Sequence, residues 1–180
     1  MKRILFIIDA QNDFCSPGGS LFCANAENAV NNICELLKTK KFDKVICTMD
    51  KHGSDYPETK EGKSITVKHC QHGTWGYLLN RNIYDALYEP EWVVYEKDSF
   101  MLDVSDMEQL LDEYSECKEM EIYVCGFATD ICVINNALLL KNTFGKKHDI
   151  FLIENCCSGT SDEMHKHAVD IMCGNFIDIV

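Results

Sequence analysis

The chain has 180 residues, a formal net charge of −12 at pH 7 and 46% hydrophobic residues. This length allows one domain with a substantial core and leaves little room for a second. The acidic balance argues against a nucleic-acid-binding surface, because neutralising phosphates requires clustered Lys and Arg. We therefore expect a single domain over 1–180 with no nucleic-acid partner.

The amino-terminal stretch does not resemble a secretory signal. Its apolar run is short, ends at Asp9 and precedes no small-residue cleavage site. No stretch approaches the length of a membrane span, so no membrane partner is expected. Without a signal peptide, the eleven cysteines are expected to be reduced thiols of a cytoplasmic protein, mostly in the core.

Short apolar runs alternate with amphipathic stretches along the chain. The amphipathic stretch at 105–116 begins with Ser105 as the expected N-cap and Glu108 completing a capping box. Because the strands are apolar throughout and alternate with helices, the pattern predicts a three-layer α/β/α fold with a six-stranded, mostly parallel, doubly wound sheet. The expected strands are 3–9, 44–50, 91–97, 121–127, 149–155 and 176–180, and the expected helices are 25–41, 105–116, 129–142 and 161–174.

One region, 51–78, is polar, contains several glycines and has no clear period. A structureless loop of this length inside a compact domain is usually functional. A short helix near 80–88 is expected to follow it.

Reactive side chains fall at the carboxyl ends of the predicted strands, where open α/β sheets bind ligands. Asp9, Asp50 and Lys97 end the first three strands, and Cys132 follows the fourth. With Thr129 as N-cap, Cys132 takes the third helical position, where the helix dipole lowers a thiol pKa. Asp9 is then the expected general base, and Lys97 the group that stabilises charge and orients Asp9.

Each of these residues also has an ordinary interpretation. A cysteine in an apolar helix is usually a small buried hydrophobe. Asp9 is also compatible with a capping role, and Lys97 with a surface position. Their joint placement at one rim of the sheet favours the catalytic interpretation.

A second group of side chains suggests a metal site. Asp50 and His52 project to the same side of an extended segment, and the long loop brings back His69 and His72. A carboxylate with two imidazoles suits Zn, Fe or Mn and leaves open positions for a ligand. The alternative is that these histidines are solvated loop residues.

Several motifs resemble a known family. "DAQNDF" (9–14), a lysine that ends the third strand and "GFATDICV" (126–133) together resemble the isochorismatase-like cysteine hydrolases. "D-x-H" (50–52) followed by "HCQHGTWG" (69–76) is similar to the nicotinamidase branch. The resemblance covers nearly the whole chain. It implies a six-stranded parallel sheet and a catalytic triad of Asp9, Lys97 and Cys132.

The resemblance also implies how the site binds an oxyanion and a metal. The Phe127–Ala128 peptide is expected to be cis, and the backbone N–H groups of Ala128 and Cys132 to hold the oxyanion. The implied metal ligands are Asp50, His52 and His69. The metal would hold the pyridine nitrogen of nicotinamide through its open positions, and His72 would be a bystander or a supporting residue.

The substrate pocket departs from the family pattern. Many nicotinamidases carry a ring-stacking Trp in a W-P-x-H-C segment, which reads "ITVKHC" here. Phe14 matches the aromatic residue of the first motif, and Trp75 or Tyr77 is expected to contribute to substrate binding. A further metal-loop histidine or serine found in some relatives is either replaced by Tyr56 here or absent.

These features predict a metal-assisted cysteine amidohydrolase that converts nicotinamide to nicotinate and ammonia through a thioester. One alternative keeps the chemistry and changes the substrate to a carbamoyl, ureido or other small amide. Others are a catalytically silent relative that binds a metabolite or partner, a thiol redox sensor, or a structural domain with many core thiols. A homo-oligomer is expected.

Overall fold

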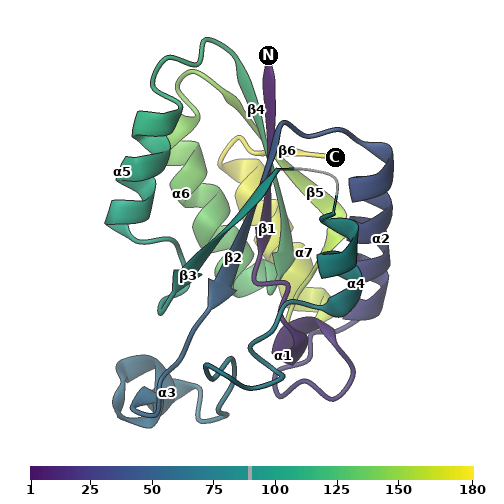
Figure 1. The fold of residues 1–180 in the computed structure, drawn as a ribbon, viewed down its shortest axis with the longest axis vertical. Helices are drawn as coiled ribbons and strands as arrows, with labels where there is room; N and C mark the ends of the chain where they lie inside the picture. Colours follow the sequence, from purple (N-terminus) through teal and green to yellow (C-terminus); the bar gives the residue numbers. More distant parts are fainter. Residues whose placement is uncertain (89–90) are drawn as a thin grey trace.

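The computed structural model describes residues 1–88 and 91–180, and its strands form a six-stranded sheet of order β3-β2-β1-β4-β5-β6 (Figure 1). Every pairing between neighbouring strands is parallel. The strands are Lys2–Ile8 (β1), Lys44–Asp50 (β2), Trp92–Lys97 (β3), Met120–Phe127 (β4), Asp149–Ser158 (β5) and Asp178–Ile179 (β6).

Helices cover both faces of the sheet. Figure 1 shows α2 and α4 on one side and α5 and α6 on the other, and α7 packs beside α6. This arrangement confirms the predicted three-layer α/β/α fold with a doubly wound sheet. The helices are Asn12–Cys15 (α1), Ala26–Thr39 (α2), Lys60–Ser64 (α3), Arg81–Ala86 (α4), Val104–Glu113 (α5), Ile134–Phe144 (α6) and Asp162–Gly174 (α7), with a 3-10 helix at Tyr56–Glu58 (η1) and a π-helical turn at Thr129–Val133 (η2).

The central strand β1 explains why this sheet needs apolar strands. All residues from Ile4 to Ile8 are buried, because β1 lies between β2 and β4 and helices cover both of its faces. Neighbouring β4 approaches β1 closely at Gly126, where a Cβ atom would lie 2.1 Å from the Ile8 carbonyl oxygen. Gly126 also has φ +127°, a conformation that glycine alone adopts easily.

The strand order determines where a site can form. From β1 the chain moves to β2 and β3 on one side, and β4, β5 and β6 continue on the other side of β1. The direction of winding therefore changes between β1 and β4. In sheets of this type, the crevice at the carboxyl ends of such strands is the usual ligand site. Asp9 follows β1 there, and the η2 turn follows β4.

Two helix starts differ from the sequence prediction. Helix α5 begins after Asp103, whose side chain accepts the Asp106 backbone N–H at 2.9 Å, so Asp103 is the N-cap and the predicted Ser105–Glu108 box is wrong. An Asp carboxylate caps a helix as well as a Ser hydroxyl does, and here the Ser105 hydroxyl itself donates to Asp103. The helix also ends earlier, at Glu113.

The helix after β4 begins with a wider turn than predicted. Ala128 occupies the cap position, and its carbonyl accepts the N–H groups of Ile131 and Val133. Thr129, the expected N-cap, is the first residue of the π turn and makes no cap hydrogen bond. Cys132 is therefore the fourth residue of this turn rather than the third.

The long loop is more ordered than its composition suggested. It contains η1 and α3, and Thr59 caps α3 by accepting the Gly62 N–H at 2.9 Å. The helix predicted near 80–88 is α4, capped by the Asn80 side chain. The last strand is shorter than predicted, because Phe176 turns the chain with φ +61°.

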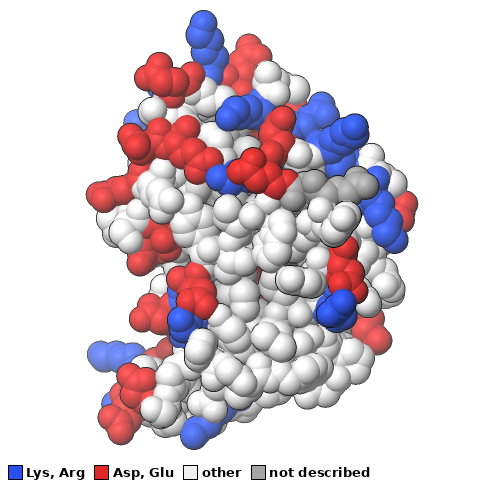
Figure 2. All heavy atoms as spheres, in the orientation of Figure 1, with Lys and Arg blue, Asp and Glu red and all other residues white. Residues whose placement is uncertain are grey.

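The distribution of charged side chains and the state of the cysteines can be compared with the sequence expectations. In Figure 2, acidic and basic side chains are interspersed over the upper part of the face, and the lower right part is mostly uncharged. All eleven cysteines are free thiols, as predicted. Within residues 1–88 and 91–180, we find no helix with both the length and the apolar character needed to cross a bilayer.

Candidate active site and metal cluster

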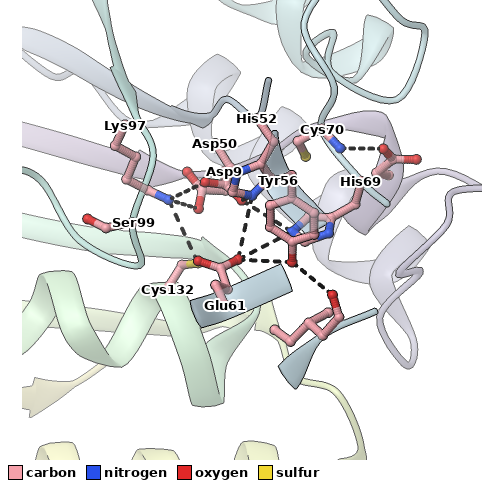
Figure 3. A network of polar contacts seen from close by, with 12 residues as sticks. Asp9, Asp50, His52, Tyr56, Glu61, His69, Cys70, Lys97, Ser99 and Cys132 are labelled. Carbon is pink, nitrogen blue, oxygen red and sulfur yellow. Dashed lines mark hydrogen bonds and ion pairs between the residues drawn. The ribbon is translucent and has the colours of Figure 1, made fainter. Parts of the chain in front are cut away.

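The rim formed by the carboxyl ends of β1 to β4 gathers the charged residues that the sequence pointed to. Asp50 and Lys97 are register partners at the ends of β2 and β3. Asp9 follows β1 directly, and Cys132 lies in the turn that follows β4. Because parallel strands end at the same edge, four separate segments place their side chains within one small volume (Figure 3).

Lys97 is the centre of this group. Its Nζ lies 2.7 Å from Asp9 Oδ2, 3.5 Å from Asp50 Oδ1 and 3.8 Å from Cys132 Sγ (Figure 3). The Lys97 side chain is 1% exposed and that of Asp9 is 0% exposed. A charge buried this deeply must be paired, and here one ammonium faces two carboxylates and a thiol.

Asp9 is held by its backbone and by one hydroxyl. Its φ is +46°, in the left-handed region, and its N–H donates to the Thr48 carbonyl and hydroxyl oxygens. The Thr48 hydroxyl donates to Asp9 Oδ1 at 2.6 Å. Asp9 Oδ2 pairs with the Lys97 ammonium at 2.7 Å. The carboxylate therefore has one oxygen on the Thr48 hydroxyl and the other on Lys97.

Burial raises the pKa values of the Asp9 carboxyl and the Cys132 thiol. Desolvation raises the pKa of the Asp9 carboxyl, opposed by the nearby Lys97 ammonium. Desolvation also raises the pKa of the Cys132 thiol, with Lys97 again acting in the opposite direction, so the lowered thiol pKa expected from the helix dipole is not found. For Lys97, the attraction of Asp9, Cys132 and Asp50 outweighs burial and raises its pKa, which keeps it positively charged. A carboxylate made more basic in this way is suited to take a thiol proton.

The segment that carries Cys132 has two unusual backbone features, a cis peptide bond and a π-helical turn. The Phe127–Ala128 peptide bond is cis, as the resemblance implied. The five-residue π turn then places Cys132 with 5% of its surface exposed, beside Lys97. Ala128 is also nearly buried and lines the large cavity described below.

A second cluster lies next to this group and contains a residue that the sequence prediction missed. Asp50, His52, Glu61 and His69 offer one ligand atom each, all within 4.8 Å of one another. His52 Nε2 lies 2.9 Å from Asp50 Oδ2 and 3.5 Å from Glu61 Oε1, and His69 Nε2 lies 3.4 and 3.8 Å from the same two oxygens. We call these four residues the metal cluster.

Glu61 reaches the cluster because the loop folds back on itself. A Cβ atom on Gly62 would lie 1.9 Å from the Tyr56 carbonyl oxygen, so glycine allows α3 to pack closely against η1. The usable sequence signal was a carboxylate next to this glycine, between the two histidine segments. Tyr56 also packs on the His52 ring at 4.2 Å, and its hydroxyl lies 3.3 Å from Glu61 Oε1.

The donor set fits a borderline divalent cation such as zinc. His69 Nδ1 lies 2.9 Å from the Val67 carbonyl oxygen, which assigns the ring proton to Nδ1 and leaves a lone pair on Nε2, toward the cluster. Burial alone would raise the pKa of Asp50, but the hydrogen bond with His52 and the Lys97 charge lower it, so its carboxylate is available as a ligand. Two imidazoles and two carboxylates are typical zinc, iron or manganese ligands.

Two further buried side chains align the cluster, and the sequence analysis had not assigned them a role. Gln11 accepts the Asp50 N–H at 2.7 Å and donates to the Asp50 carbonyl at 2.8 Å. Asp13 accepts the Cys70 N–H at 2.7 Å and the Ser20 N–H at 3.0 Å. Gln11 and Asp13 both lie in the "DAQNDF" motif. The motif therefore supplies Asp9 and also two side chains that support the metal cluster.

Of the substrate-binding residues predicted from the sequence, Phe14 lines a cavity and Trp75 does not. Phe14 lines a cavity of about 450 Å³, and its ring lies 5.6 Å from the His69 ring. Trp75 is 53% exposed and is not among the described residues that line this cavity. His72 lies outside the metal cluster and packs against Tyr77 at 5.3 Å. The cavity is lined by Phe14, Ser20, Leu21, Phe22, Cys23, Ile65, Ala128, Ile131 and Thr160.

The fold and the site define a doubly wound α/β protein with a buried Asp–Lys–Cys group beside a metal cluster. A family model described as the isochorismatase domain matches residues 3–180, and the chain belongs to this family. The chain is 26% identical over 189 residues to the nicotinamidase/pyrazinamidase of Mycobacterium tuberculosis, covering 96% of this chain and 100% of that protein.

Solved structures share the fold. Similar ones include PnC1 of L. infantum in complex with nicotinate (TM-score 0.81, 20% identity, 99% of this chain and 92% of that chain). Another is the pyrazinamidase of Pyrococcus horikoshii in complex with zinc (TM-score 0.77, 21% identity, 100% of this chain and 99% of that chain). The predicted membership of this family is confirmed.

Proposed function

We propose that this protein is a cysteine amidohydrolase that converts nicotinamide to nicotinate and ammonia. The observation that carries the proposal is the Lys97 ammonium, which lies 2.7 Å from the Asp9 carboxylate and 3.8 Å from the Cys132 thiol. A buried base, a cation and a thiol in mutual contact are the parts needed for nucleophilic attack. The nicotinamidase/pyrazinamidase relative and the nicotinate-bound neighbour support the same substrate class.

In the first half of the reaction, Asp9 accepts the Cys132 proton and the thiolate attacks the carboxamide carbon. Lys97 stabilises the negative charge that Asp9 and the thiolate share during this transfer. The backbone N–H groups of Ala128 and Cys132 stabilise the oxyanion of the tetrahedral intermediate. Asp9 returns the proton to the leaving amine, and ammonia departs from a thioester on Cys132.

In the second half, Asp9 acts again as the base. It accepts a proton from a water molecule, which attacks the thioester carbonyl, and the same N–H groups hold the second oxyanion. Collapse of that intermediate releases the carboxylate product, and the proton on Asp9 returns to the Cys132 thiolate. Asp9 therefore needs a raised pKa in both halves, in agreement with its burial.

The metal cluster has a separate role in the proposal. Asp50, His52, Glu61 and His69 would hold a divalent ion, whose chemistry when bound is to fix the ring nitrogen of the substrate as a template. The zinc complex of the structural neighbour supports zinc. Phe14 would contact the substrate ring, since it lines the cavity and its own ring lies 5.6 Å from the His69 ring.

A second candidate keeps the chemistry and changes the amide. The cavity of about 450 Å³ is large for a single pyridine ring, and its lining includes Leu21, Phe22, Ile65 and Ile131. An amide with a larger apolar body would bury more surface there. This observation favours testing larger aromatic amides beside nicotinamide.

Ammonia and carboxylate release from an amide panel tests the proposal. The purified protein is given nicotinamide, benzamide, which lacks the ring nitrogen, and a larger aromatic amide, before and after chelation and zinc restoration. We expect nicotinate and ammonia in equal amounts, and a larger rise in KM on chelation for nicotinamide than for benzamide. No ammonia from any amide by the zinc-restored protein would contradict the proposal.

A further inference from the structure

Two consecutive residues of the η2 turn, Thr129 and Asp130, form hydrogen bonds with the segment 159–165. The Asp130 carboxylate accepts the Thr160 N–H at 2.8 Å and the Thr160 hydroxyl at 2.6 Å. The Thr129 hydroxyl lies 2.8 Å from His165 Nδ1, on the first turn of α7. Hydrogen bonds with Thr160 and with His165 at the start of α7 therefore anchor the turn that carries Cys132.

The contact between Thr129 and His165 satisfies a buried polar group. Thr129 is 0% exposed, and among the described residues His165 is the recorded side-chain partner of its hydroxyl. A buried hydroxyl needs an acceptor for its proton, and His165 Nδ1 supplies one if the ring proton is on Nε2. Nε2 faces Glu154 Oε1 at 3.7 Å, which favours that tautomer.

Gly159 allows this close packing. A Cβ atom at Gly159 would lie 2.7 Å from Asp130 Oδ1 and 3.0 Å from His165 Cβ. A side chain at this position would displace the Asp130 carboxylate and crowd the start of α7 at His165. Glycine therefore favours the close packing of the η2 turn against α7.

We propose that His165 is a positioning residue of the active site, acting through Thr129 on the turn that presents Cys132 and the N–H groups of Ala128 and Cys132. This inference rests on the proposed function for its kinetic consequence. Thr129 directly follows Ala128, so a shift of Thr129 moves the adjacent N–H donor. Because oxyanion stabilisation depends on donors placed within a fraction of an ångström, a small displacement lowers the rate of the chemical step.

The test uses substitutions at both ends of the contact in the full-length, zinc-restored protein. His165→Ala and Thr129→Val each remove one partner, and the double variant removes both. His165→Asn keeps an acceptor close to the place of Nδ1, whereas His165→Gln moves it one methylene further. His167→Ala is the matched control, since His167 is an exposed histidine on the same helix.

Three kinetic results are expected. His165→Ala and Thr129→Val each lower kcat about tenfold and change KM less than about twofold, because binding contacts are kept. The double variant falls no further than the lower single variant, since both substitutions break one contact. The kcat of His165→Asn stays within about threefold of the wild-type value, whereas that of His165→Gln falls by more.

A second measurement does not need turnover. The rate at which iodoacetamide alkylates Cys132 is followed by mass spectrometry, with the exposed Cys173 as an internal reference. We expect slower alkylation of Cys132 in both single variants and no further slowing in the double variant, because a displaced thiol loses the nearby Lys97 charge.

The outcomes separate the two proposals. If wild type hydrolyses no amide but the alkylation pattern holds, the proposed function fails and the positioning role stands. If His165→Ala keeps the wild-type kcat and alkylation rate, the positioning role is wrong even where nicotinamide is hydrolysed. A lower melting temperature with unchanged kcat, or fully additive losses in the double variant, would equally overturn it.

Discussion

At the scale of single residues, one buried positive charge, that of Lys97, balances the negative charges of the site. The Lys97 ammonium pairs with both the Asp9 and the Asp50 carboxylates, and so links Asp9 to the metal cluster. The sequence alone predicted Asp9, Lys97 and Cys132 because strand ends of a parallel sheet converge. Glu61 was missed because it lies in a loop without a period, where spacing predicts no direction for a side chain.

Glu61→Gln tests the composition of the metal cluster. The amide removes a negative charge and a strong ligand, so we expect zinc affinity to fall at least about tenfold. Competition with a chromogenic chelator measures this affinity without substrate. Glu58→Gln, an exposed glutamate in η1, is the control and should bind zinc as the wild type does. Equal affinity of Glu61→Gln and wild type would remove Glu61 from the cluster.

At the scale of elements, the strands were predicted well and the helix starts less well. Apolar runs fixed the strands, because a strand buried on both faces tolerates few polar residues. Caps were wrong where two capping residues competed, as at Asp103 and Ser105, and where tertiary contacts used the side chain, as with Thr129 and His165. Hydrogen bonds to distant segments are invisible to local sequence patterns.

The β1–β4 approach gives a prediction about stability. Gly126→Ala places a Cβ atom 2.1 Å from the Ile8 carbonyl oxygen and forces alanine to adopt φ +127°. We expect the free energy of unfolding in urea to fall by more than about 2 kcal/mol. Gly174→Ala at the end of α7, where a Cβ atom meets nothing within 4 Å, should leave it unchanged or slightly higher. Comparable stabilities of the two variants would contradict the close-approach argument.

At the scale of the whole molecule, we expect the abundant buried thiols to lower the free energy of unfolding at alkaline pH. Burial raises the pKa values of Cys23, Cys47 and Cys156 from 9.0 to about 12. A group whose pKa is raised by folding contributes full stability below its unfolded pKa and loses it as the pH rises toward the folded value. The affected window therefore lies between about pH 9 and 12.

Unfolding under reducing conditions at pH 7, 8.5 and 10 measures this effect. Each of these thiols should account for roughly 1–2 kcal/mol of lost stability by pH 10, because the unfolded thiol ionises and the folded one does not. Other groups titrate in this range, so the matched variant is Cys47→Ala, whose decline with pH should be smaller by one thiol. An identical pH dependence in the variant and the wild type would show that Cys47 does not contribute.

The central claim is that Cys132, among eleven cysteines, is the nucleophile. The most direct test compares ammonia release from nicotinamide by wild type, Cys132→Ala and Cys125→Ala, with Cys125 a fully buried cysteine of β4. We predict a loss of at least about a thousandfold in kcat for Cys132→Ala, as for removal of other catalytic nucleophiles, and a loss of only a few-fold for Cys125→Ala. Substantial ammonia release by Cys132→Ala would contradict the account.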